Sequence, residues 1–157
     1  MQVAIVPYTV ATAPVEARLH DSYTTASSAT LSQTGIAVPV YFPAAGDDAV
    51  GHRLLRETVA ACSAHVADPA CLCLSVDGEA HGRQVAEELG SVHGVQVCVA
   101  EQNRGKLQGV RKGMAQLLES RDFEYLAAVD SDGDHFANEL VNLGRAARHV
   151  RGRAGVE

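Results

Sequence analysis

Four short apolar segments recur along the chain, and each is followed by a segment whose apolar residues have helical spacing. The apolar segments are IAVPVYF (36–42), CLCLSV (71–76), VQVCVA (95–100) and YLAAV (125–129). The helical patterns cover 52–66, the region from Val85 to Leu89 with a stop at Gly90 or Gly94, 107–118 and 140–150. Continuous apolar strands alternating with helices predict an α/β fold, a mostly parallel Rossmann-like sheet with helices on both faces.

The third and fourth helices are predicted from apolar residues at helical spacing. These are Leu107, Val110, Met114, Leu117 and Leu118 in the third helix, and Leu140, Leu143, Ala147 and Val150 in the last. The chain of 157 residues is long enough for one domain with a core. We place this domain at residues 35–157. Residues 1–34 are predicted to be an extension or linker, because residues 21–35 are polar and rich in Ser and Thr.

Composition excludes several classes of protein. Hydrophobic residues make up 46% of the chain and charged residues 20%, which is typical of a soluble globular protein. The net charge of −6 argues against nucleic-acid binding. No apolar run reaches the ~20 residues of a membrane span, and no basic residue precedes the N-terminal apolar stretch, so a cytoplasmic protein is expected. The four cysteines form no CxxC pair and are expected to be buried free thiols.

Polar residues lie at the end of every predicted strand or directly after it. They are Tyr41, Asp77, residues 103–106 and residues 130–134. Ligands of open parallel sheets bind outside the carboxyl ends of the strands. The sequence therefore predicts one binding site to which all four strands contribute.

The segment LAAVDSDGDH (126–135) permits three interpretations. It is a solvated turn, since Asp and Gly are turn residues. It is the Asp-x-Asp-Gly motif of an aspartate-type phosphatase, although no Lys, Ser or Thr follows Asp134. Or Asp130 and Asp132 hold Mg²⁺ or Mn²⁺, which bind one or two carboxylates together with substrate phosphate oxygens. The metal would then stabilise negative charge on a diphosphate leaving group.

Four motifs in order resemble the nucleotide-binding half of a family 2 glycosyltransferase with the GT-A fold. They are VPVYF, LSVDG, NRGKLQGVRKGM and AAVDSDGDHFANEL. The first departs from the family where Phe42 replaces the usual Asn. The resemblance implies a UDP- or GDP-sugar as the ligand, bound with Mn²⁺ or Mg²⁺ held by Asp130 and Asp132. It implies these nucleotide-binding residues: Pro39, Tyr41, Asp77, Asn103, Gly105, Lys106 and Asp130.

In this family the acid matched by Asp77 contacts the base or ribose, so we expect an exposed Asp77 whose removal costs no more than about 1 kcal/mol of stability. The family's catalytic base lies beyond the metal motif, where no residue of this chain matches it. The chain is thus expected to be a fragment of an inverting glycosyltransferase without its base, or a non-catalytic nucleotide-binding or assembly module. The motifs do not identify the acceptor. A truncated sheet would leave an open edge through which copies could associate.

Overall fold

The computed structural model describes residues 31–43, 48–78, 82–134 and 137–154. Nearly all of the predicted extension lies outside these residues. Within them, Leu31 is fully buried, and the first strand begins at Thr34.

The sheet has four parallel strands in the order β3-β2-β1-β4. They are β1 (Thr34–Val40), β2 (Leu72–Asp77), β3 (Gln96–Ala100) and β4 (Tyr125–Ala128). This confirms the predicted parallel α/β fold. The first strand begins two residues earlier than the predicted 36, because Thr34 and Gly35 pair with Tyr125 and Leu126 of β4.

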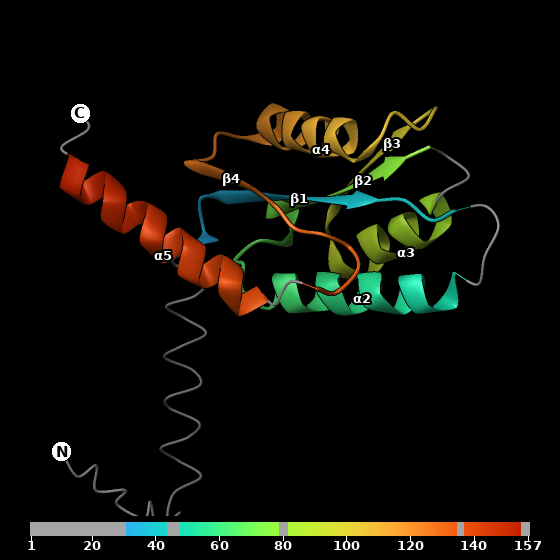
Figure 1. Ribbon diagram of the computed structural model, residues 1–157, viewed down its shortest axis with the longest axis horizontal. Helices are drawn as coiled ribbons and strands as arrows, with labels where there is room; N and C mark the ends of the chain where they lie inside the picture. Colours follow the sequence, from blue (N-terminus) through green and yellow to red (C-terminus); the bar gives the residue numbers. More distant parts are fainter. Residues whose placement is uncertain (1–30, 44–47, 79–81, 135–136, 155–157) are drawn as a thin grey trace, which may run out of the picture.

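Helices cover both faces of the sheet, as predicted (Figure 1). They are α2 (Ala49–Ser63), α3 (Arg83–His93), α4 (Lys106–Ser120) and α5 (Ala137–Ala154), with a short 3₁₀ helix η1 (Pro69–Cys71) before β2. In Figure 1, α4 lies on one side of the sheet and α2 and α3 lie on the other. Within the described residues, no helix combines the length and the apolar character that a membrane span requires.

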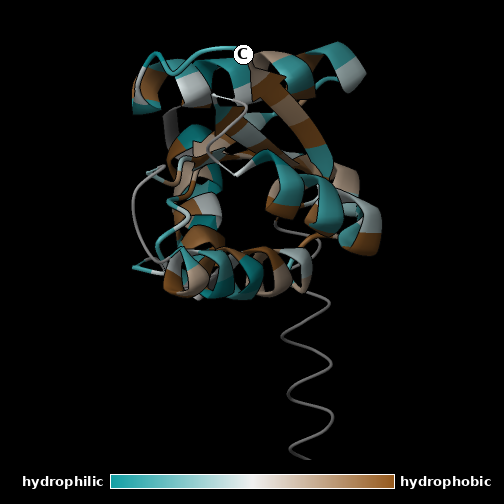
Figure 2. Ribbon diagram, turned by 90° about the vertical axis from the view of Figure 1, so that its right-hand side faces the viewer, coloured by the Kyte–Doolittle hydropathy of each residue, from teal (hydrophilic) through white to brown (hydrophobic). Residues whose placement is uncertain are grey.

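The side chains of the central strands alternate between two cores. Ile36, Val38 and Val40 pack with Leu55 and Val59 of α2 in the larger core. Ala37 and Cys73 point to the opposite face, toward α4, in a smaller core that also contains Cys98 of β3 and Leu117 of α4. In Figure 2 the strands are mostly hydrophobic in colour, whereas the helices alternate between hydrophilic and hydrophobic residues. These colours are expected of amphipathic helices that pack against a sheet whose two faces are both buried.

Helix α4 packs against the sheet mainly through glycine residues. Its buried residues are Gly109, Gly113 and Leu117. A Cβ at Gly113 would lie 3.1 Å from the Cβ of Ala37, closer than side chains normally pack, so a larger residue would crowd the sheet. Two apolar residues of the helical pattern face solvent, since Leu107 and Leu118 are 77% and 52% exposed. The sheet residues that face α4 are small, so the glycines of α4 pack directly against them. Leu107 and Leu118 lie on other sides of the helix and therefore face solvent.

Helix α3 continues to His93 and is capped by Gly94 at φ +72°, which is one of the two predicted stops. Gly90 instead allows close packing, because a Cβ there would lie 2.7 Å from Cγ2 of Val97. In α5, Leu143 and Val150 of the apolar pattern are exposed, whereas Leu140 is buried. This helix packs on α2 near its start and then runs out beyond the sheet (Figure 1).

Candidate functional site

A cavity of about 440 Å³ opens at the carboxyl ends of the strands. All seven predicted nucleotide-binding residues and both predicted metal ligands line it. The complete lining is Pro39, Val40, Tyr41, Asp77, Asn103, Gly105, Lys106, Asp130, Ser131 and Asp132. The structure therefore brings the candidate residues together, although their binding of a nucleotide or metal stays a prediction.

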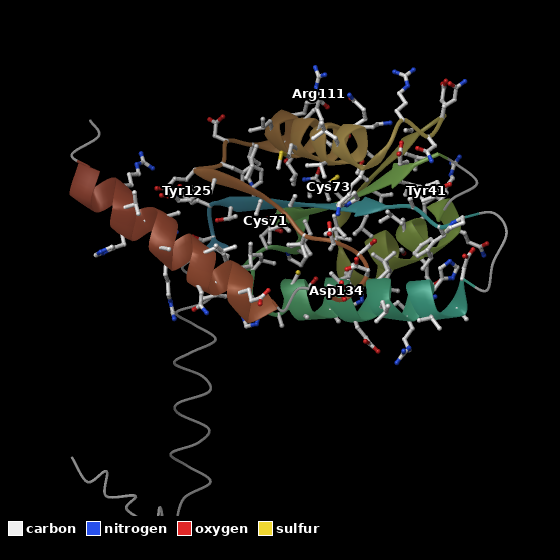
Figure 3. All side chains as sticks on the ribbon, in the orientation of Figure 1. Tyr41, Cys71, Cys73, Arg111, Tyr125 and Asp134 are labelled. Atoms are coloured by element: carbon white, nitrogen blue, oxygen red, sulfur yellow. The ribbon has the colours of Figure 1, made fainter. Side chains whose placement is uncertain are left out.

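The order of the strands explains this convergence. From β1 the chain moves outward to β2 and β3, and then returns to place β4 on the other side of β1. The loops that follow β1 and β4 consequently diverge, which leaves a crevice at the carboxyl edge of the sheet. Open α/β sheets bind ligands at such a topological switch point. Figure 3 shows Tyr41 at this edge and Tyr125 at the opposite end of the sheet.

Asp77 holds the loop before α4. Its carboxylate accepts hydrogen bonds from the backbone amides of Arg104 at 2.9 Å and Gly105 at 2.8 Å. Asp77 is only 4% exposed, so the expectation of an exposed side chain was wrong. The reason is that the loop after β3 folds over the end of β2. The side-chain oxygen of Asn103 also accepts from the Gly105 amide at 2.8 Å, and Gly105 has φ +89°, which favours glycine.

Lys106 and Asp130 form an ion pair across the cavity. The Lys106 Nζ atom lies 2.5 Å from Oδ2 of Asp130. Lys106 is the first residue of α4, where the helix dipole disfavours a cation. The Asp130 carboxylate offsets that repulsion, and an anionic ligand at the same place would do so as well.

The acidic loop after β4 contains a tight turn. The amide of Asp134 donates to Oδ1 of Asp132 at 3.2 Å, and Gly133 has φ +82°. Both carboxylates are exposed, but only Asp132 lines the cavity. Asp134 lies near α2 in Figure 3. These contacts agree with the turn interpretation and leave the carboxylate oxygens of Asp130 and Asp132 at the cavity wall.

The oxygen ligands suit a hard divalent cation, but they would form only part of its shell. Across 31–43, 48–78, 82–134 and 137–154, no three His, Cys, Asp or Glu side chains are grouped closely enough to hold a metal ion. Mg²⁺ commonly binds through one or two carboxylates and completes its octahedron with water and phosphate oxygens. Asp130 and Asp132 therefore fit a metal that arrives with a phosphate ligand.

All four cysteines are buried and free, which confirms the sequence prediction. Cys73 and Cys98 lie on adjacent strands with their sulfur atoms 3.7 Å apart. The hydrogen bond from the Cys73 thiol lowers the pKa of Cys98 to about 6, with help from the Ser75 hydroxyl and the Lys112 charge and against the effect of burial. The same contact raises the pKa of Cys73.

Sequence reasoning missed one lining residue of the cavity at the carboxyl ends of the strands, Val40, whereas Ser131 lies within the predicted range 130–134. Sequence reasoning also missed a second cavity beside α4, of about 520 Å³, whose lining includes Arg104, Gln108 and Lys112. The basic residues are visible in the motif NRGKLQGVRKGM, but the sequence did not indicate which face of α4 they occupy.

Comparison with known proteins finds no relative: no family model, no curated protein and no solved structure matches this chain. The resemblance to family 2 glycosyltransferases therefore depends on the four ordered motifs alone.

Proposed function

We propose that this chain binds a nucleotide-diphosphate sugar together with Mn²⁺ or Mg²⁺, as the donor-binding part of a glycosyltransferase of the family 2 type. The proposal depends on one observation, namely that the residues selected from the sequence come together at one cavity. Residues that follow four different strands, chosen from the sequence for this role, line one cavity of about 440 Å³ at the switch point of the sheet.

The start of α4 supplies the diphosphate side of the proposed site. The first amide groups of a helix have no intrahelical partner, and the helix dipole favours an anion there. Gly105 and Lys106, which form this helix start, both line the cavity. The Gly105 amide already donates to Asp77 and Asn103, so in this proposal a diphosphate lies between the Lys106 amide and the Lys106 ammonium.

Asp130 and Asp132 supply the metal side. The cation would replace Lys106 as the partner of Asp130, which frees the ammonium for a phosphate oxygen. A bound cation would stabilise negative charge on the departing diphosphate. The Tyr41 side chain, 44% exposed at the cavity, offers an aromatic face for the base. The resemblance implied that Asp77 contacts the base or ribose. In this proposal Asp77 instead positions the loop before α4, because its carboxylate binds backbone amides of that loop.

Titration calorimetry of the whole chain with UDP and GDP tests the proposal, with and without Mn²⁺. Saturable binding of one nucleotide that needs Mn²⁺, and that is lost in Asp132→Ala but kept in Asp134→Ala, is the expected result. No binding of either nucleotide at millimolar concentration would refute it.

A donor-hydrolysis assay then separates the two forms of the proposal. Slow release of nucleotide from UDP- or GDP-sugars with Mn²⁺ would indicate a transferase site in which water replaces the acceptor. Binding without release over hours would indicate a non-catalytic binding or assembly module.

A further inference from the structure

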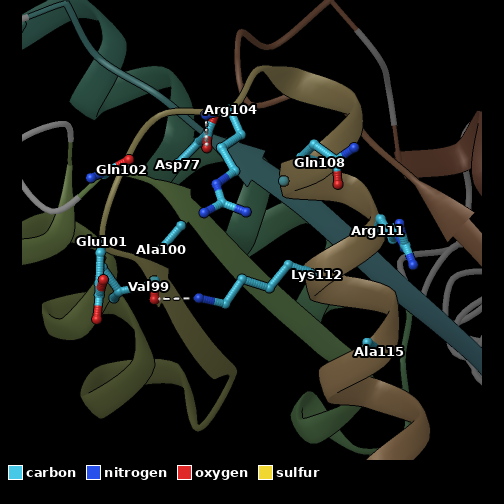
Figure 4. A pocket seen from close by; sticks show the side chains of 11 residues that line it. Asp77, Val99, Ala100, Glu101, Gln102, Arg104, Gln108, Arg111, Lys112 and Ala115 are labelled. Atoms are coloured by element: carbon cyan, nitrogen blue, oxygen red, sulfur yellow. Dashed lines mark hydrogen bonds between the residues drawn. The ribbon is translucent and has the colours of Figure 1, made fainter.

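The second cavity lies on the other side of Asp77, between α4 and the end of β3 (Figure 4). Its volume is about 520 Å³, somewhat larger than that of the first cavity. Small residues leave it open, since Ala100, Gly109 and Ala115 form part of its lining. Only Asp77 belongs to both cavities, so side chains of one can be changed without touching the other.

The lining of this cavity is cationic. Arg104, Arg111 and Lys112 contribute positive charge, and the acids are Asp77 and Glu101. Asp77 is bound to backbone amides. Lys112 donates to the carbonyl of Val99, a neutral partner, so its charge is not compensated by an acid there (Figure 4). This excess of positive charge occurs in a chain whose net charge is −6.

The arginines of the cavity differ from most others in the structure. Five arginines form ion pairs with acids, namely Arg53 with Glu57, Arg56 with Glu88, Arg83 with Glu87, Arg121 with Asp68 and Arg151 with Glu124. Within the part of the chain that the structure describes, neither Arg104 nor Arg111 has an acidic partner. Figure 4 shows Arg104 and Lys112 extending over the space between β3 and α4, with Arg111 at the outer rim.

We infer that this second cavity is an anion site that binds the phosphoryl group of a small molecule through Arg104, Lys112 and Gln108. A guanidinium fork matches the geometry of phosphate oxygens, and an ammonium adds a point charge. The Lys112 ammonium has three donors, of which the Val99 carbonyl takes one. The amide of Gln108 adds a neutral donor on the same helix wall. The site is separate from the proposed nucleotide cavity and does not require that function.

The test is titration of the whole chain with pyrophosphate at constant ionic strength and without metal, followed by calorimetry or by backbone amide chemical shifts. Arg104→Gln removes the guanidinium but keeps the backbone amide that Asp77 binds, so the loop is retained. Gln108→Glu places a carboxylate one helical turn before Lys112 and neutralises it. Each variant is expected to weaken binding about tenfold or more, as loss of a charged hydrogen bond does.

Two controls locate the site. Arg53→Gln makes the same change in charge on α2 and should leave pyrophosphate affinity unchanged. Lys106→Gln removes the cation of the first cavity and should also leave it unchanged. The inference is overturned if pyrophosphate does not bind saturably, if acetate binds equally well, or if Lys106→Gln abolishes binding while Arg104→Gln does not. Pyrophosphate binding that survives in a chain unable to bind UDP or GDP would sustain this site and reject only the proposed function.

Discussion

The carboxylate of Asp77, at the end of β2, accepts a 2.8 Å hydrogen bond from the backbone amide of Gly105, the residue before α4. A second bond, from the amide of Arg104, completes the attachment. One side chain thus fixes the loop that forms a wall of both cavities. The sequence match alone had suggested a ligand contact for this residue.

Asp77→Ala is expected to destabilise the fold by about 2–4 kcal/mol, because the backbone amides of Arg104 and Gly105 lose a charged acceptor. Urea denaturation measures this loss. Asp134→Ala, an exposed acid in the loop after β4, is the matched control and should change stability by no more than about 0.5 kcal/mol. Equal unfolding midpoints for the two variants would show that the Asp77 hydrogen bonds contribute little.

Metal and nucleotide should bind cooperatively. Two carboxylates leave an octahedral ion incomplete, so Mn²⁺ alone should bind weakly and a nucleoside diphosphate should tighten it. Calorimetry in both orders of addition measures the coupling, which must be the same in each order. Asp132→Ala should abolish the coupling. Tight Mn²⁺ binding without nucleotide would contradict a two-carboxylate site.

Gly113 should tolerate no branched side chain. A Cβ there would lie 3.1 Å from Ala37 and 3.2 Å from Ser75, so Gly113→Val must push α4 away from the sheet. Overpacking of this kind costs about 1–3 kcal/mol. Ala115→Val makes a similar change at an exposed position of the same helix and should cost less. Thermal melts of the two variants compare them directly.

Cys98 should react as a thiolate at neutral pH. The Cys73 thiol donates to it, and its pKa is lowered to about 6. The rate of its alkylation by iodoacetamide, followed by peptide mass spectrometry, should rise from pH 5 and level off near pH 7. Reaction will be slow, since Cys98 is 7% exposed. In Cys73→Ala the donor is lost, so the midpoint should move to higher pH; an unchanged midpoint would rule out this contact as the cause.

Hydrophobic periodicity was sufficient to predict the parallel sheet, because a buried strand reads as a continuous apolar run and a covering helix has its own period. The strands fell within two residues of their expected positions. The residues of the candidate cavity could also be selected, since the carboxyl ends of parallel strands share one edge. Pro39, Lys106 and Asp130 are far apart in sequence, but position on this edge alone makes them neighbours.

The sequence by itself thus determined the class of fold and the edge of the sheet where polar groups gather. Only the tertiary structure decided which face of each helix is buried, as Leu107, Leu118 and Leu143 show. A helix orients by the fit of its whole surface to the sheet, and at α4 that fit is made by Gly109 and Gly113. Likewise, a carboxylate at a strand end has the same sequence context whether it meets a ligand or a backbone amide. For Asp77 the choice depended on where the loop after β3 came to lie, which no local pattern records.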